Sequence, residues 1–174
     1  NTNMLALAHK IPAATDADLP ALLILSLILG DGKTSRLYRA LIDSAKATNV
    51  TTVCYQFHDP SLLISYITLA PRIKHEAVER LVKKEFEKII SRGVIPKELS
   101  TAKRTIRASI AARRDGPYAF LSSLNEEIAT GDWTRFVTLP KLLASVTAKE
   151  VQRVAKKYLV DDQSTIGYFI GTKL

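Results

Sequence analysis

The sequence predicts an α+β fold in which an antiparallel sheet carries helices packed on one face. Strand-like runs lie near the N-terminus, in the middle and at the C-terminus, whereas helical periodicity fills residues 74–160. Strands and helices do not alternate as in a parallel sheet, which disfavours dinucleotide-binding and phosphate-loop folds. The 174 residues are 47% hydrophobic and 24% charged, as in a soluble globular chain. We expect residues 1–174 to form a single domain.

The first strand and the first helix are predicted from contrasting patterns. The run Met4–Ile11 has the period of two of a half-buried strand, and Pro12 ends it. One face of this strand is expected to carry Leu5, Leu7, His9 and Ile11. The run from Asp18 to Leu29 is instead apolar all round and indicates a helix buried on most sides. Its apolar stretch, Leu19–Leu29, has 11 residues, whereas a membrane-spanning helix needs about 20. We therefore expect a buried helix and no membrane span.

A short helix and a hairpin are expected next. Gly30 ends the buried helix, and a short helix follows over Arg36–Asp43. The runs Val50–Phe57 and Leu62–Leu69 are rich in β-branched and aromatic residues, and residues 58–61 have turn composition, so they predict an antiparallel hairpin. One face of the first of these strands is expected to carry Val53, Tyr55 and Phe57.

Five further helices and a closing strand complete the prediction. Gly93, Gly116 and Gly131 separate the helices, and a capping box at residues 147–150 begins the last of them. A strand is expected over Thr165–Ile170. The apolar positions that define the four longest helices are Val78, Val82, Phe86, Ile89 and Ile90; Leu99, Ala102, Ile106 and Ile110; Leu121, Leu124 and Ile128; and Val151, Val154, Ala155, Tyr158 and Leu159.

Residues that could bind a metal or act as a nucleophile are scattered along the chain. His9 falls in a strand, His58 in a turn and His75 at a helix start, so neither zinc motif with paired histidines can be written. We expect His75 to be solvated. Cys54 is the single cysteine, lies in a strand and is expected to fill the sheet. The sequence therefore predicts no catalytic residue and no metal ligand in this chain.

Basic residues outnumber acidic ones, with 25 Lys and Arg against 17 Asp and Glu. Lys103, Arg107 and Arg114 fall on one face of a predicted helix, opposite Ile106 and Ile110. No stacking aromatics interleave with these charges, so nucleic acid is not an expected partner. A surface for acidic partners on this helix stays open as an alternative.

Four motifs in series give the chain a resemblance to a known family. Residues 27–41, LILGDGKTSRLYRAL, are similar to the Leu-Gly-x-x-x-x-Ser-Arg-Leu-Tyr-x-x-Leu signature of the pitrilysin/insulinase family of zinc metallopeptidases. These are the inverzincins, which are relatives of the mitochondrial processing peptidase. Further matches are DPSLL at 59–63, GDW at 131–133 and VTAKEVQRVAKKYL at 146–159. The residues that carry the first motif are Gly30, Ser35, Arg36, Leu37 and Tyr38.

The resemblance implies a protein built from α+β units of similar fold that close around a peptide substrate. In such a protein one unit binds zinc through His-x-x-Glu-His and a downstream Glu, and the Glu of the motif activates water. This sequence resembles the unit that follows a zinc-bearing one, the non-catalytic C-terminal-type domain. Many members carry an Arg and a Tyr, seven residues apart, that grip the substrate. Ile42 and Asn49 occupy those positions here.

We therefore expect a non-catalytic domain of a zinc metallopeptidase, and a fragment of a longer multi-domain chain. Its expected partners are a zinc-bearing domain or subunit and a peptide substrate, and zinc is expected only in the parent protein's catalytic domain. An alternative is an enzymatically silent structural or assembly subunit of the same fold. The resemblance suggests the bacterial cytoplasm or periplasm.

Overall fold

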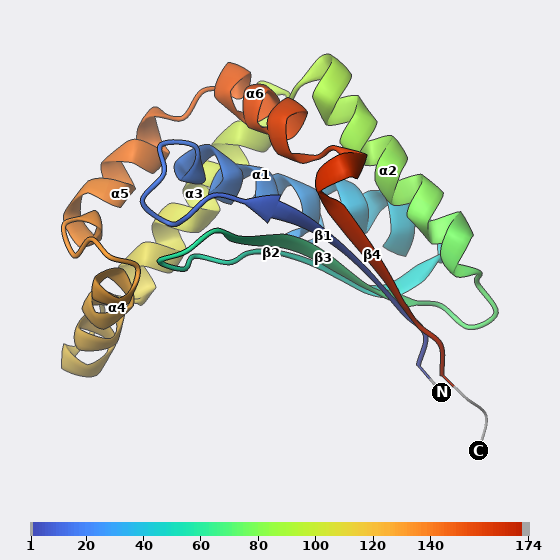
Figure 1. The fold of residues 1–174 in the computed structure, drawn as a ribbon, viewed down its shortest axis with the longest axis horizontal. Helices are drawn as coiled ribbons and strands as arrows, with labels where there is room; N and C mark the ends of the chain where they lie inside the picture. Colours follow the sequence, from blue (N-terminus) through green and yellow to red (C-terminus); the bar gives the residue numbers. More distant parts are fainter. Residues whose placement is uncertain (1, 172–174) are drawn as a thin grey trace.

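The computed structural model describes residues 2–171 as a four-stranded antiparallel sheet with helices on one face (Figure 1). The strands run in the order β2-β3-β1-β4, so the last strand of the chain pairs with the first. The predicted fold class and the predicted hairpin of β2 and β3 are both confirmed. The strands are β1 (Met4–Ile11), β2 (Ala47–Cys54), β3 (Ser61–Leu69) and β4 (Ser164–Phe169).

The helices form two layers above the sheet. Helices α1, α2 and α6 contact strands, whereas α3 and α5 contact α1 from the side away from the sheet. Helix α4 contacts α5 and projects beyond the end of the sheet (Figure 1). The helices are α1 (Leu19–Gly30), the π-helical turn η1 (Tyr38–Ile42), α2 (His75–Arg92), α3 (Pro96–Ala112), α4 (Pro117–Ala129), α5 (Arg135–Ser145), α6 (Ala148–Tyr158) and the 3-10 turn η2 (Asp161–Gln163).

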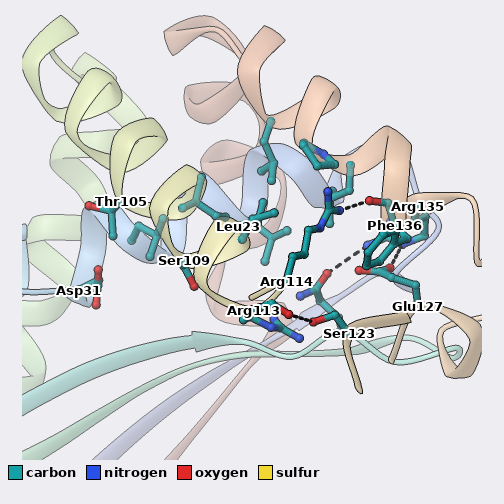
Figure 2. A pocket seen from close by; sticks show the side chains of 17 residues that line it. Leu23, Asp31, Thr105, Ser109, Arg113, Arg114, Ser123, Glu127, Arg135 and Phe136 are labelled. Carbon is teal, nitrogen blue, oxygen red and sulfur yellow. Dashed lines mark hydrogen bonds and ion pairs between the residues drawn. The ribbon is translucent and has the colours of Figure 1, made fainter. Parts of the chain in front are cut away.

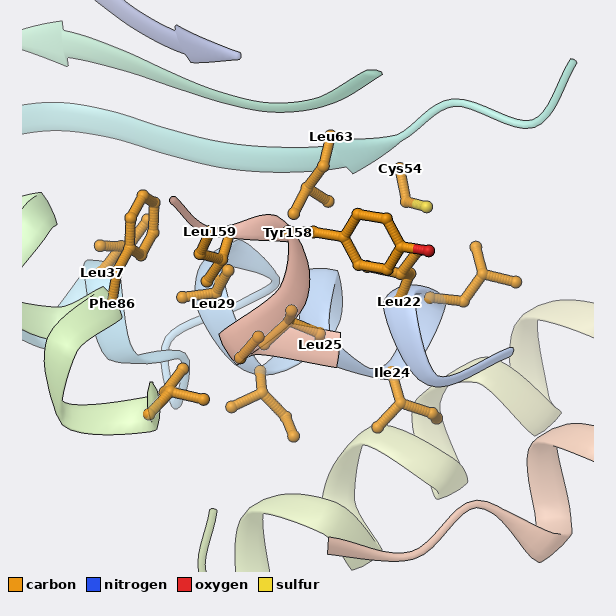
Figure 3. Packing of buried hydrophobic residues seen from close by; sticks show 14 of the residues in the cluster. Leu22, Ile24, Leu25, Leu29, Leu37, Cys54, Leu63, Phe86, Tyr158 and Leu159 are labelled. Atoms are coloured by element: carbon orange, nitrogen blue, oxygen red, sulfur yellow. The ribbon is translucent and has the colours of Figure 1, made fainter. Parts of the chain in front are cut away.

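Helix α1 is the centre of the hydrophobic core. All of its residues are buried except Leu27, as its apolar sequence predicts. Figure 3 shows its side chains among Leu63 of β3 and Tyr158 of α6 on one side, while Ile24 points toward α3 on the other. Because α1 has no polar face, it needs a cover on both sides, and the second helical layer supplies it.

The two faces of the sheet differ in burial. The helical face of β1 carries the four residues predicted for it, Leu5, Leu7, His9 and Ile11, and all are buried. In β2 the buried positions are instead Ala47, Val50, Thr52 and Cys54. Val53 and Tyr55 lie on the open face of the sheet, and β2 ends at Cys54, so the exposed Phe57 lies outside the strand. The predicted extent of this strand, Val50–Phe57, was therefore wrong at both ends, because β2 begins and ends three residues earlier.

Helices α3 and α4 form where predicted but bury little of their own surface. Ala102 is the one fully buried residue of α3, and α4 has none. On α4, Tyr118, Leu121 and Ile128 are 86%, 57% and 54% exposed. These helices lie at the margin of the fold, where α3 packs on α1 and α4 packs on α5, and much of each helix stays exposed. The predicted short helix over Arg36–Asp43 is one helical turn that continues into η1.

Gly30 allows the C-terminal end of α1 to approach β2 closely. A Cβ atom at Gly30 would lie 2.6 Å from the backbone nitrogen of Thr52 and 2.2 Å from its Oγ1. Backbone atoms in a paired strand cannot move aside without breaking the ladder. The glycine of the motif is therefore explained by packing.

We expect Gly30→Ala to lower the free energy of unfolding by more than about 2 kcal/mol, because the added methyl group overpacks the contact between α1 and β2. Urea unfolding followed by far-ultraviolet circular dichroism measures it. Gly167→Ala is the control, since a Cβ at Gly167 meets nothing within 4 Å. Equal stability of the two variants would contradict the packing role of Gly30.

Candidate functional site

The motif residues form the turn between α1 and η1. Ser35 donates its hydroxyl to the carbonyl of Gly32 at 2.8 Å and so closes the turn. Leu37 is completely buried, whereas Tyr38 is half-buried. The contacts of Ser35 and Leu37 therefore stabilise the local fold.

Arg36 is the motif residue with the strongest interaction. Its Nε and Nη2 donate to the two carboxylate oxygens of Glu98, each at 2.8 Å, and Nη2 also donates to the carbonyl of Gly93 at 3.0 Å. The two side chains are 14% and 15% exposed. Burial favours a raised pKa for Glu98, but the hydrogen bonds from Arg36 and from the Ile95 amide outweigh it and lower that pKa. Arg36 therefore fastens the turn to the first turn of α3.

Ile42 and Asn49 occupy the two positions where the resemblance places the substrate-gripping pair. Ile42 ends η1 and packs against the core, partly buried. Asn49 lies exposed in β2, next to an irregularity in its pairing with β3. Neither side chain supplies a guanidinium or a phenol, so these positions cannot act as that pair does.

The histidines do not converge. Within residues 2–171 no three His, Cys, Asp or Glu side chains come together in a group that could hold a metal ion. His9 is buried in β1 with its ring edge-on to Phe86, and His58 is exposed in the hairpin link. His75 was expected to be solvated, but it is buried because its ring stacks on Tyr168 and its Nε2 lies 3.1 Å from the Phe169 carbonyl.

Cys54 is a core residue, as expected. Its side chain faces the helices, and burial raises the pKa of the thiol to about 12. The thiol therefore stays protonated at neutral pH and is a poor nucleophile.

The face of the sheet opposite the helices is open and apolar. Ala6 pairs with Tyr66, and Ile64 pairs with both Ala8 and Val53. All of these side chains are partly exposed, and the hydroxyls of Tyr55 and Tyr66 lie 3.4 Å apart. Sequence reasoning missed this surface, although the apolar residues at both odd and even positions of the strands were a signal for it. The open face offers aromatic and aliphatic contacts without a charge at its centre.

A cleft of about 380 Å³ lies between α1, α3, α4 and α5 (Figure 2). Leu23 and Leu27 of α1 belong to its apolar lining. Its polar wall is occupied by internal contacts, since the buried Arg135 donates to Glu127 at 2.9 Å, to Gln56 at 3.1 Å and to the carbonyl of Ala14. The arginine thus ties α4 and α5 to the loops at the end of the sheet.

A second arginine, Arg114, supplies the hydrogen-bond donor that α5 lacks at Pro140. Pro140 has no amide hydrogen, so it leaves the carbonyl of Phe136, four residues earlier, without its helical donor. Arg114 donates to that carbonyl, and its guanidinium lies 4.0 Å from the centre of the Phe136 ring. The end of α3 is therefore fastened to α5 at the proline.

Comparison with known proteins gives a consistent result. The sequence pattern described as the peptidase M16 inactive domain matches residues 1–106. The zinc protease PqqE of Helicobacter pylori (strain ATCC 700392 / 26695) is 26% identical over 161 residues, which are 92% of this chain. The chain spans 36% of the length of that relative.

Two solved structures resemble the whole fold. The inactive peptidase domain of a candidate zinc protease from Bordetella parapertussis has a TM-score of 0.91 and 26% identity, and covers 99% of this chain and 94% of its own. A candidate zinc protease from Bordetella pertussis Tohama I has a TM-score of 0.89 and 27% identity, and covers 98% and 94%. None of the helices in residues 2–171 combines the length and apolar composition that crossing a bilayer requires.

We expect Arg36→Ala to lower the free energy of unfolding by about 2–3 kcal/mol, because the Glu98 carboxylate is then left largely buried without its partner. Denaturant unfolding measures the change. Lys33→Ala is the control, since Lys33 is exposed in the same turn. Removing both Arg36 and Glu98 should cost less than the sum of the single changes, and strict additivity would exclude the pair as the cause.

We expect the stability of the protein to fall as pH decreases from about 6.5 to about 4 because of His9. Burial lowers the pKa of His9 from its ordinary value of 6.5 to about 4, with Asp161 opposing the shift and Lys83 adding to it. In this window the unfolded chain binds a proton that the folded chain excludes, so protonation favours unfolding. Below about pH 4 both states are protonated and this loss is complete.

His9→Leu removes the titrating group and keeps an apolar side chain against Phe86. Between pH 7 and pH 4.5 this variant should lose about 2 kcal/mol less stability than the parent chain. Urea unfolding at the two pH values provides the comparison. Parallel losses in both proteins would show that His9 does not control this part of the pH profile.

Proposed function

Because this chain belongs to the peptidase M16 inactive-domain family, we propose that it forms a non-catalytic wall of the substrate chamber in a zinc metallopeptidase. The observation that carries the proposal is the similarity, over 99% of the chain, to the inactive peptidase domain from Bordetella parapertussis. The proposal assigns the zinc to a separate domain bearing His-x-x-Glu-His, since residues 2–171 bring no suitable group of ligands together.

The open face of the sheet is the surface that we assign to the chamber. Tyr55, Tyr66 and Ile64 place aromatic and aliphatic groups on it, and no helix of residues 2–171 covers it. Such a face can bind the apolar side chains of an extended peptide without selecting one sequence. The helical side then faces neighbouring domains, to which the exposed apolar residues of α4 offer contacts.

The proposal includes a parent protein longer than this chain. The relative from Helicobacter pylori is nearly three times as long as the matched region, which supports residues 1–174 as a single domain of a multi-domain peptidase. Its partners would be the zinc-bearing domain, in the same chain or as a second subunit, and a peptide substrate. The bacterial relatives favour the bacterial cytoplasm or periplasm as the compartment.

The experiment is a comparison of this chain alone with the same chain assembled with its zinc-bearing partner, identified from the gene by the His-x-x-Glu-His motif. Metal content after dialysis and cleavage of a peptide library are measured. We expect neither stoichiometric zinc nor cleavage from the chain alone, and chelator-sensitive cleavage from the assembly. Zinc held by the chain alone would overturn the proposal. A partner without the motif, or an inactive assembly, would favour a silent structural or assembly subunit.

A variant on the open face tests the chamber assignment directly. In the assembly, Tyr66→Ala should lower kcat/KM for peptide cleavage roughly tenfold without changing the zinc content, because a contact with the substrate is lost. Lys84→Ala is the control, since Lys84 is exposed on α2, on the helical side of the sheet. Unchanged kcat/KM in Tyr66→Ala would remove the open face from substrate binding.

A further inference from the structure

A second cleft lies on the other side of the contact between α3 and α5. The cleft of Figure 2 includes Thr105 and Ser109 of α3, whereas this groove includes Lys103 and Arg107, which the helical period places on the opposite side of the contact. Its volume is about 380 Å³. The residues that line it are Ser100, Lys103, Arg104, Ile106, Arg107, Ile110, Pro140, Leu143 and Ala144.

The floor of the groove is apolar and extends along α3. Ile106 and Ile110 of α3 face Pro140 and Leu143 of α5. From Ser100 to Ile110 the groove follows α3 for roughly 15 Å, at 1.5 Å per residue, which matches about three turns of a partner helix. A groove between two helices with such a floor suits the apolar face of a third helix.

Contacts at the two ends of the α3–α5 pair hold the groove in shape. At one end Lys103 Nζ donates to the carbonyl of Ala144 at 2.6 Å, in the last turn of α5. At the other end Arg114 donates to the carbonyl of Phe136, which Pro140 leaves without a helical donor. Since both ends of the α3–α5 pair are fastened, a ligand would meet a groove that is already formed, and binding would cost little ordering of the protein.

The rim of the groove is positively charged. Lys103, Arg104 and Arg107 line it together, and no acidic residue does. Arg104 and Arg107 are exposed, and within residues 2–171 neither takes part in an ion pair. The groove therefore combines an apolar floor with two guanidinium groups, those of Arg104 and Arg107, that form no ion pair within residues 2–171.

We propose that the groove between α3 and α5 binds an acidic amphipathic helix of a partner protein. The apolar floor takes side chains spaced i, i+3, i+4 and i+7 on that helix, and the guanidinium groups of Arg104 and Arg107 pair with carboxylates beside this stripe. A single nucleic-acid strand fits the site less well, because no aromatic side chain lines it for base stacking. The proposal extends beyond the chamber wall and does not rest on it.

The test is binding of a fluorescein-labelled peptide of about 18 residues, long enough to form a helix, built from Leu, Ala and Glu with Leu at i, i+3, i+4 and i+7. Fluorescence anisotropy with the 174-residue chain gives Kd at about 50 and 300 mM salt. Arg104→Glu combined with Arg107→Glu should weaken binding at least tenfold. Ala144→Trp, which fills the groove and leaves its charges in place, should weaken it by a similar factor.

Matched variants separate this site from general attraction to a basic protein. Arg80→Glu combined with Lys84→Glu makes the same charge change on the exposed face of α2 and should leave Kd within twofold. Ala108→Trp, on an exposed part of α3 outside the groove, should do the same. Equal binding of a peptide with the same composition in scrambled order would overturn the proposal. Tighter binding of a single-stranded DNA that the Arg104/Arg107 variant abolishes would overturn it as well.

Discussion

The burial of α1 on all sides is the constraint on which the architecture depends. Ten of its side chains are apolar and only Leu27 is partly exposed, so no orientation of this helix can present a favourable face to water. Each Leu or Ile that it buries contributes about 2 kcal/mol relative to exposure. The sheet covers one side, and α3, α5 and α6 must cover the rest. A single sheet with one helical layer would leave this helix half exposed.

A polar contact at one end of α1 and a close backbone approach at the other fix how it lies within that core. At its N-terminus the Asp18 carboxylate accepts hydrogen bonds from Arg153, Lys157 and Tyr158 of α6. Burial favours a raised pKa for Asp18, but these three donors outweigh it and hold that pKa well below its ordinary value. At the C-terminus Gly30 lies against β2. Apolar packing alone is not directional, so these contacts set the rotation and register of the helix.

The parts of the fold that depend on local pattern could be predicted, and those that depend on distant partners could not. The capping box of Thr147 and Glu150 could be predicted because its two members are only three residues apart, and both of its hydrogen bonds are present. The burial of His75 depends on Tyr168, which lies in the last strand. Likewise β2 has apolar residues on both faces, and only its pairing with β3 decides which face meets the helices.

Contacts between residues far apart in the sequence also could not be predicted for the functional surfaces. The sequence identifies Arg36 as part of a motif, but its partner Glu98 is 62 residues away, so the ion pair could not be inferred from spacing. The amphipathic patterns of α3 and α4 predict that each helix has an apolar face that another element covers. The periodicity itself identifies the apolar face but does not show which element packs against it. The sequence pattern therefore cannot show whether the element that covers an apolar helix face belongs to this chain or to a partner protein.

The exposed apolar surfaces of α4 and of the open sheet face are better explained by partner proteins that cover them than by poor packing of this chain. Within residues 2–171 every buried side-chain nitrogen and oxygen has a hydrogen-bond partner, so the polar side chains of the interior are satisfied. Yet Tyr118, Leu121 and Ile128 form an exposed apolar stripe on α4, and the open sheet face carries Tyr55 and Tyr66. Contiguous apolar surfaces of this kind on a folded protein mark sites of contact with other proteins, which agrees with the chamber wall and the partner helix proposed above. The charges and apolar grooves on these surfaces then determine which partner proteins bind there.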